Sequence, residues 1–178
     1  MGLFESLQAG GRGQEREQRG GQTLRPEAQR ERQEFDDFIR RYEQGPPSEG
    51  YSDQEALQRY QQVAPHASPE VYEDAAREAF ERLTPQQRAE FGQYLRQRAR
   101  QQNLNVPDLN QDGIDDRLQD PATLARVTSR IHEQEPGTFD QLLGGRGAQV
   151  ANALNNPLAK AALAGIAAMA AKRILSGR

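Results

Sequence analysis

One short acidic stretch holds the side chains in this sequence that are best suited to chemistry. Oxygen-bearing side chains stand at the alternate positions Asp108, Asn110 and Asp112, and Gly113 and Asp116 follow them. This spacing allows a loop to surround a hard cation with oxygen ligands while glycine makes the sharp turn. Without a cation the neighbouring carboxylates would repel one another. The stretch therefore predicts a Ca²⁺-binding loop.

The loop resembles the calcium loops of EF-hand, dockerin and thrombospondin type 3 proteins over about thirteen residues, without any flanking domain. The resemblance implies that the ion would be held by Asp108, Asn110, Asp112, Ile114 through its carbonyl oxygen, Asp116 and Asp120. The sequence departs from the EF-hand pattern at Asp115, where an apolar residue is usual, and at Gln119, where a bidentate glutamate is usual. The alternative is a metal-free turn in which Asp120 caps the next helix.

The composition limits the kinds of site that the chain can build. Its 178 residues contain no cysteine and two histidines, His66 and His132, so there is no thiol chemistry and little material for a zinc site or a catalytic triad. The carboxylates of Asp36 and Asp37 are adjacent in sequence and are not a pair held across a substrate. The formal net charge is −3. We therefore expect neither catalysis nor general binding of nucleic acid.

Hydrophobic periodicity predicts an all-α protein built around a small helical bundle. Residues 1–25 are rich in Gln, Arg, Glu and Gly, and this composition predicts a disordered N-terminal arm. The bundle is predicted over 26–102, where Phe35, Phe38 and Tyr42 recur at helical spacing. Capping residues, often with proline at the first helical position, mark further helix starts at Ser52, Ser68 and Thr84. The rest of the chain is predicted to form a calcium-type loop over 103–120, a short helical segment over 121–143, a Gly/Asn-rich linker over 144–155 and a separable C-terminal helix over 156–178.

The C-terminal helix is the second candidate site. After Asp140 the chain has no Asp or Glu but retains five Lys and Arg residues. From Ala161 onward, 11 residues lack a polar side chain, whereas a membrane-spanning helix needs about 20 apolar residues. Small-residue pairs such as Ala161 and Gly165 allow two helices to approach closely. Lys172 and Arg173 would favour an acidic partner or lipid headgroups.

These features favour a non-catalytic interaction or scaffold protein that docks through its C-terminal helix, with the calcium-type loop bracing the junction. The residues predicted to contact a partner or a membrane are Leu158, Ala161, Leu163, Gly165, Ile166, Met169, Lys172 and Arg173. The partner is another protein or a second copy of the chain. The alternatives are an anionic membrane surface, packing of the helix within its own bundle, and a calcium-responsive binding protein. The absence of a secretory signal predicts a cytoplasmic location. If the helix binds an anionic membrane surface instead, the protein would lie at the membrane periphery. As a whole the chain resembles small bacterial proteins that begin Met-Gly-Leu-Phe and end in a small-residue helix, a resemblance that implies no activity.

Overall fold

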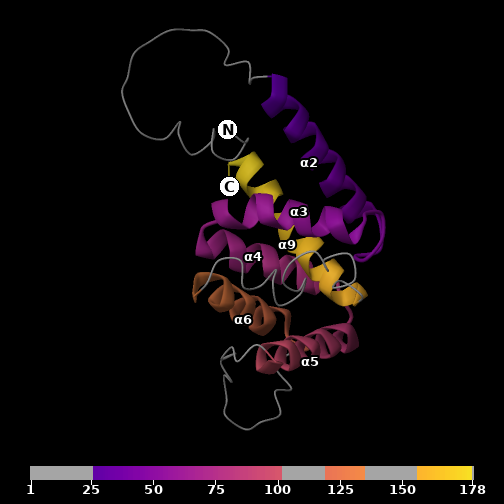
Figure 1. Ribbon diagram of the computed structural model, residues 1–178, viewed down its shortest axis with the longest axis vertical. Helices are drawn as coiled ribbons and strands as arrows, with labels where there is room; N and C mark the ends of the chain where they lie inside the picture. Colours follow the sequence, from indigo (N-terminus) through magenta and orange to yellow (C-terminus); the bar gives the residue numbers. More distant parts are fainter. Residues whose placement is uncertain (1–25, 102–118, 135–155, 178) are drawn as a thin grey trace.

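Helices form every regular element in the part of the chain that the structure describes. The computed structural model describes residues 26–101, 119–134 and 156–177. Figure 1 shows the helices, which are α2 (Pro26–Gln44), α3 (Asp53–Val63), the short 3₁₀ helix η1 (Ala64–His66), α4 (Pro69–Glu81), α5 (Pro85–Gln101), α6 (Pro121–Gln134) and α9 (Pro157–Ser176). The all-α prediction is confirmed for these residues. The predictions made for 1–25, 103–118 and 135–155 lie outside the described residues.

The helix starts follow the predicted capping residues. The hydroxyl oxygens of Ser52 and Ser68 each accept a hydrogen bond from the backbone amide three positions further on, at 3.1 and 3.3 Å. Thr84 and Gln87 form a reciprocal pair, because each backbone amide donates to the other's side-chain oxygen at 2.9 and 3.2 Å. The side-chain oxygen of Asn156 accepts from the backbone amide two positions on at 2.8 Å. Each cap satisfies a first-turn N–H that has no partner within the helix.

The C-terminal helix α9 is the central element of the described bundle. It packs against α2, α3 and α4, and it makes smaller contacts with α5 and η1. Figure 1 shows α9 passing among α2, α3 and α4, while α6 lies along α4 and α5 lies at the far end from α2. All but one of the 14 side-chain positions from 158 to 171 are buried, the exception being the partly exposed Lys160. The chain therefore builds its core around its last helix.

The direction of α9 relative to its neighbours is fixed by contacts at both of its ends. Near its start, the Lys160 ammonium lies 3.3 Å from a carboxylate oxygen of Asp53 at the start of α3, so the two helices run parallel. Near its end, Arg173 lies 3.4 Å from Asp74 in the first half of α4. Nearer the middle of α9, Gly165 faces Ala79 near the end of α4. Helices α4 and α9 therefore run antiparallel.

The expectation of a separable C-terminal helix is corrected by this packing. The helix was predicted to stand apart because it is joined to the rest of the chain by a Gly/Asn-rich linker. A linker of that composition sets only the freedom of the connection and says nothing of where the helix comes to rest. The bundle of α2, α3 and α4 offers buried side chains such as Tyr42 and Ala79, and α9 covers these two with the small residue Gly165. Intramolecular packing, one of the alternatives left open by the sequence, is what the structure contains.

Candidate functional site: the exposed end of the C-terminal helix

The residues predicted to bind a partner fall into two groups in the structure. Six of them are buried within the folded chain: Leu158, Ala161, Leu163, Gly165, Ile166 and Met169. Burying each large apolar side chain is worth about 1.5–3 kcal/mol, whereas a domain of this size has a total stability of about 5–15 kcal/mol. Removing α9 from the bundle would therefore unfold the protein, so these six side chains are not accessible to a partner in the folded state.

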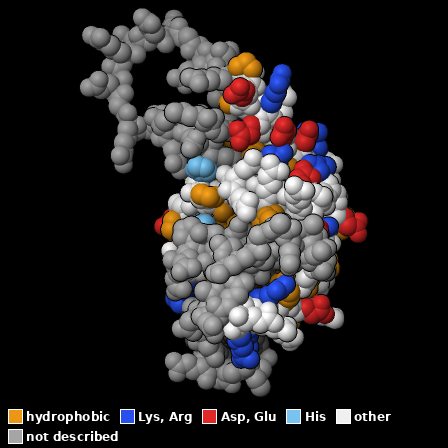
Figure 2. Space-filling model, in the orientation of Figure 1, with side chains coloured by type: hydrophobic (Ala, Val, Ile, Leu, Met, Phe, Trp, Pro, Cys, Tyr) orange, Lys and Arg blue, Asp and Glu red, His pale blue; other side chains and the backbone are white. Residues whose placement is uncertain are grey.

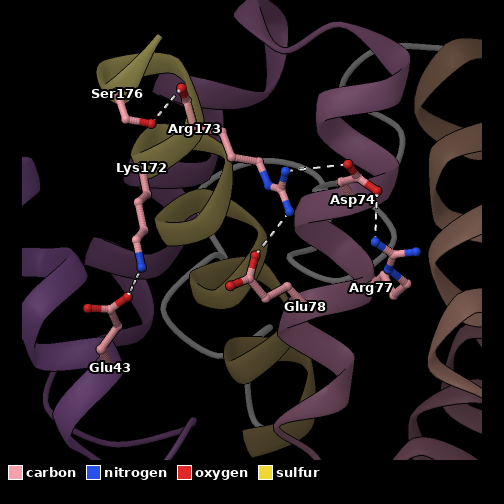
Figure 3. A network of polar contacts seen from close by, with 7 residues as sticks. All are labelled: Glu43, Asp74, Arg77, Glu78, Lys172, Arg173 and Ser176. Atoms are coloured by element: carbon pink, nitrogen blue, oxygen red, sulfur yellow. Dashed lines mark hydrogen bonds and ion pairs between the residues drawn. The ribbon is translucent and has the colours of Figure 1, made fainter. Parts of the chain in front are cut away.

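The other two predicted residues, Lys172 and Arg173, lie at the surface in the last turns of α9 (Figure 3). The Lys172 ammonium forms an ion pair with the carboxylate of Glu43 in α2. The Arg173 guanidinium spans two carboxylates of α4, with nitrogen–oxygen distances of 3.4 Å to Asp74 and 3.2 Å to Glu78. These pairs hold the end of α9 against α2 and α4. They also mean that the basic character predicted for this helix is largely neutralised by the chain itself.

The network also includes Arg77, which lies between Asp74 and Glu78 in α4, and it is partly open to water. Arg77 lies 3.1 Å from Oδ1 of Asp74, whereas Arg173 contacts Oδ2 of the same carboxylate. Asp74 therefore contacts two arginines. The Ser176 hydroxyl donates to the Arg173 carbonyl at 3.2 Å and occupies one of the last carbonyls of α9. The Lys172 side chain is 52% exposed, so its ion pair is screened by solvent and contributes little to stability by itself.

Partly exposed apolar side chains lie at the same end of the bundle as this network. Helix α9 contacts η1 and α4. Because α9 runs parallel to α3 and antiparallel to α4, its end lies toward η1 and the first half of α4. Four partly buried apolar side chains lie on α4, on α9 or in the turn between η1 and α4, and we call them the terminal patch: Ala67, Val71, Ile174 and Leu175. The patch is the place where α9 combines apolar and basic side chains at the surface.

The predicted calcium loop is described only at its end. The Asp120 carboxylate oxygen Oδ2 accepts hydrogen bonds from both the backbone amide and the hydroxyl of Thr123, each at 2.8 Å. The Thr123 hydroxyl, together with backbone amides, holds the pKa of Asp120 below its usual value. Asp120 therefore caps α6, as the alternative of a metal-free turn predicts. The other predicted ligands, Asp108, Asn110, Asp112, Ile114 and Asp116, lie outside the described residues.

Sequence reasoning missed two arginines that hold helix ends together. Arg82 donates to the carbonyl oxygens of Tyr42 at 2.5 Å, Glu43 at 3.2 Å and Gly45 at 3.0 Å, all at the C-terminal end of α2. Arg88 donates to the carbonyl of Leu83 at the end of α4 and to that of Gln119 just before α6. Free carbonyls at helix ends attract such donors. In the sequence both residues look like ordinary exposed helix positions, and no local signal marks them.

A buried polar and aromatic cluster was also missed. The hydroxyl groups of Tyr60 and Tyr72 lie 2.8 Å apart in a hydrogen bond that joins α3 to α4. The imidazole of His132 in α6 stacks on the Tyr72 ring, with a centroid distance of 4.3 Å and an angle of 4° between the planes. Thr128 and Ser129 of α6 are also buried. The polar contact between the two tyrosines depends on how the helices pack, which hydrophobic periodicity does not encode.

Comparison with protein-family models, with curated proteins and with solved structures finds no match for this chain. None of the described helices is long and apolar enough to cross a membrane. Within residues 26–101, 119–134 and 156–177, no group of three or more His, Asp or Glu side chains is arranged to hold a metal ion. The terminal patch and its ion pairs therefore remain the candidate site that the geometry offers.

Proposed function

We propose that this protein is a non-catalytic interaction or scaffold protein that binds a protein partner through the terminal patch. The observation that carries the proposal is the position of the last turn of α9. The body of that helix completes the core, while Ile174 and Leu175 remain partly exposed beside Lys172. Apolar side chains rimmed by charged ones are typical of protein contact surfaces. The C-terminal helix thus serves in two ways, as the core of the bundle and as the base of the patch.

The charge around the patch favours a protein partner over an anionic membrane. Lys172 and Arg173 already have carboxylate partners, and a lipid surface would have to replace them. Those carboxylates, on Glu43, Asp74 and Glu78, would themselves be repelled by anionic headgroups. On the face drawn in Figure 2, acidic and basic side chains are interspersed near the top, where α2 lies. A partner that offers an apolar surface meets no such repulsion.

The proposal is tested with variants of the full-length chain that change the patch and leave the core intact. Leu175→Asp places a charge on the patch, and Gln97→Asp places the same charge on the exposed face of α5 as a matched control. Both variants must first show the thermal unfolding midpoint of the unmodified chain. A partner captured from cell extract is then purified and titrated directly by calorimetry. We expect Leu175→Asp to raise the Kd at least tenfold, which is about 1.4 kcal/mol, and Gln97→Asp to leave it unchanged.

Two other results would overturn the proposal. Equal affinity of Leu175→Asp and the unmodified chain would move the contact away from the terminal patch. Co-sedimentation of the unmodified chain with vesicles rich in anionic lipid, lost in Lys172→Glu, would favour the membrane alternative instead. Sedimentation equilibrium of the purified chain distinguishes a second copy from a different protein, because self-association needs no added partner.

A further inference from the structure

The second half of α5 carries a surplus of positive charge. After Glu90 the helix contains Arg96, Arg98 and Arg100, and no acidic residue follows before the helix ends. The negative end of the helix dipole favours basic residues here, but it amounts to roughly half an elementary charge and balances less than one of them. Figure 2 shows basic side chains at the end of the molecule where α5 lies.

The packing of α5 decides which of its side chains face solvent. Phe91 and Leu95 are 0% and 1% exposed, so they mark the side of the helix that meets the core. At about 100° per residue, Arg98 and Arg100 fall on the two flanks of the opposite side, with Gln97 between them. Gln97 and Arg100 are exposed and Arg98 is partly exposed. We call the following side chains the basic face: Tyr94, Arg96, Gln97, Arg98 and Arg100.

A tyrosine fixes the position of one guanidinium of the basic face. The Nε group of Arg98 donates a hydrogen bond to the Tyr94 hydroxyl at 3.2 Å, and its guanidinium carbon lies 5.4 Å from the centroid of the Tyr94 ring. The Tyr94 ring packs against the core, which limits its movement. Neither Arg98 nor Arg100 forms an ion pair with any described residue, whereas the basic residues of α9 are all paired.

We propose that the basic face is a second contact surface, which binds an acidic segment of another protein. A guanidinium offers a planar fork of N–H donors that matches the two oxygens of a carboxylate. Tyrosine and arginine are also among the side chains that contribute most to protein contacts. Helix α5 follows the end of α4, and Arg88 binds the Leu83 carbonyl there, whereas the terminal patch lies beside the start of α4. The two surfaces therefore suit different partners, and the inference stands independently of the terminal patch.

The extent of the basic face favours a short acidic peptide over a nucleic acid. Residues 91–101 span about 16 Å along the helix axis, which about five extended residues of a peptide would match. The exposed carboxylates of Glu81 and Glu90 precede this stretch in the chain. They would repel a phosphate backbone that continues past the face, and the formal net charge of −3 opposes it as well. The side chains of the face are polar or aromatic, so none is an aliphatic anchor for lipid.

Fluorescence anisotropy of a labelled peptide of six glutamates, titrated with the full-length chain at low salt, tests the basic face. We expect Arg98→Glu combined with Arg100→Glu to raise the Kd at least tenfold. Arg30→Glu combined with Arg32→Glu makes the same change of charge at exposed positions of α2. This control should change the Kd less than twofold, because salt screens charges that lie more than about 10 Å from the bound peptide.

Two further variants keep this test separate from that of the terminal patch. Gln97→Asp places a carboxylate within the basic face and should raise the Kd of the peptide, whereas Leu175→Asp should leave it unchanged. The opposite result is expected for the partner of the terminal patch, so failure of either proposal can be recognised. Every variant must keep the thermal unfolding midpoint of the unmodified chain. If the double charge reversal does not, Arg98→Gln combined with Arg100→Gln replaces it.

Absence of peptide binding, or an equal Kd in the variant with both arginines reversed, would overturn the inference. Tighter binding of a thymidine oligonucleotide than of the peptide would assign the face to nucleic acid instead. Binding that appears only when Asp112, Asp115 and Asp116 are all changed to Asn would also overturn it. That result would show that the acidic stretch of the chain itself covers the face.

Discussion

Gly165 of α9 lies so close to Tyr42 of α2 that a β-carbon at position 165 would stand 2.6 Å from the tyrosine hydroxyl oxygen. The same β-carbon would stand 2.6 Å from the β-carbon of Ala79 in α4. Glycine at this point lets three helices meet, and the flanking alanines of α9 extend the close contact along the helix. The small-residue pattern that suggested a docking helix is thus used inside the bundle.

Gly165→Ala is expected to destabilise the protein by about 1–3 kcal/mol, because the added methyl group overfills a closely packed core. Chemical denaturation with urea measures the change. Gln97→Ala, at an exposed position of α5, is the control and should change the unfolding free energy by less than about 0.5 kcal/mol. Adding Ala79→Gly to Gly165→Ala should recover part of the loss. Full stability of Gly165→Ala would contradict the close packing at this point.

Removal of residues 156–178 is expected to abolish cooperative folding of the remaining chain. The bundle of α2, α3 and α4 would then expose the side chains that α9 covers, including Tyr42 and Ala79. Circular dichroism and dispersion of amide signals in NMR spectra measure the outcome. A truncated chain that keeps a sharp thermal transition would show that α9 is a separable element after all. For this reason truncation cannot serve as a binding test.

Alkaline pH is expected to destabilise the protein through its buried tyrosines. Burial raises the pKa of Tyr42 to about 12, with the charge of Arg82 opposing the effect, and burial likewise raises the pKa of Tyr51. Tyrosine in the unfolded chain ionises near pH 10. Stability is therefore unaffected below that pH and falls as the pH rises toward 12, by about 1.4 kcal/mol per pH unit for each such group. Tyr42→Phe should reduce the slope, as measured by urea denaturation at several pH values. An unchanged slope would contradict the assignment.

Arg82→Ala is expected to lower the unfolding free energy by about 1.5–3 kcal/mol. The guanidinium serves three carbonyl oxygens at the end of α2 and lies over the Tyr42 ring, 4.4 Å from its centroid. Hydrogen bonds from a charged donor are worth about this amount. Arg82→Lys should recover only part of the loss, because an ammonium lacks the planar fork that reaches several carbonyls. Equal stability of the lysine variant and the unmodified chain would show that charge alone matters.

One pair of variants distinguishes calcium binding by the loop from the capping role of Asp120. If the loop binds Ca²⁺, terbium luminescence should report the site in the unmodified chain and disappear in Asp112→Ala. Asp120→Ala should lower the unfolding free energy by about 1 kcal/mol even in chelator, because it removes the cap of α6. No luminescence at millimolar terbium would remove the calcium hypothesis. A loss in Asp120→Ala that occurs only with calcium present would contradict the capping role.

The sequence by itself determined the helices and their starts. Apolar side chains at helical spacing, such as Phe35, Phe38 and Tyr42, mark the buried face of α2, and Ser52 and Ser68 cap the helices predicted to begin at them. These signals are readable because they act between residues a few positions apart, where the geometry of the helix fixes which atoms meet.

The tertiary structure alone decided what the C-terminal helix does. An apolar helix of small residues can pack against a partner, a membrane or its own chain, and these environments leave the same pattern in the sequence. The choice depends on whether α2, α3 and α4 leave a space of matching shape and charge. They do so through Tyr42 and Ala79 facing Gly165, and through carboxylates such as Glu43 that pair with the basic end of α9. Contacts between residues so far apart in the chain follow from packing, and local sequence patterns do not encode them.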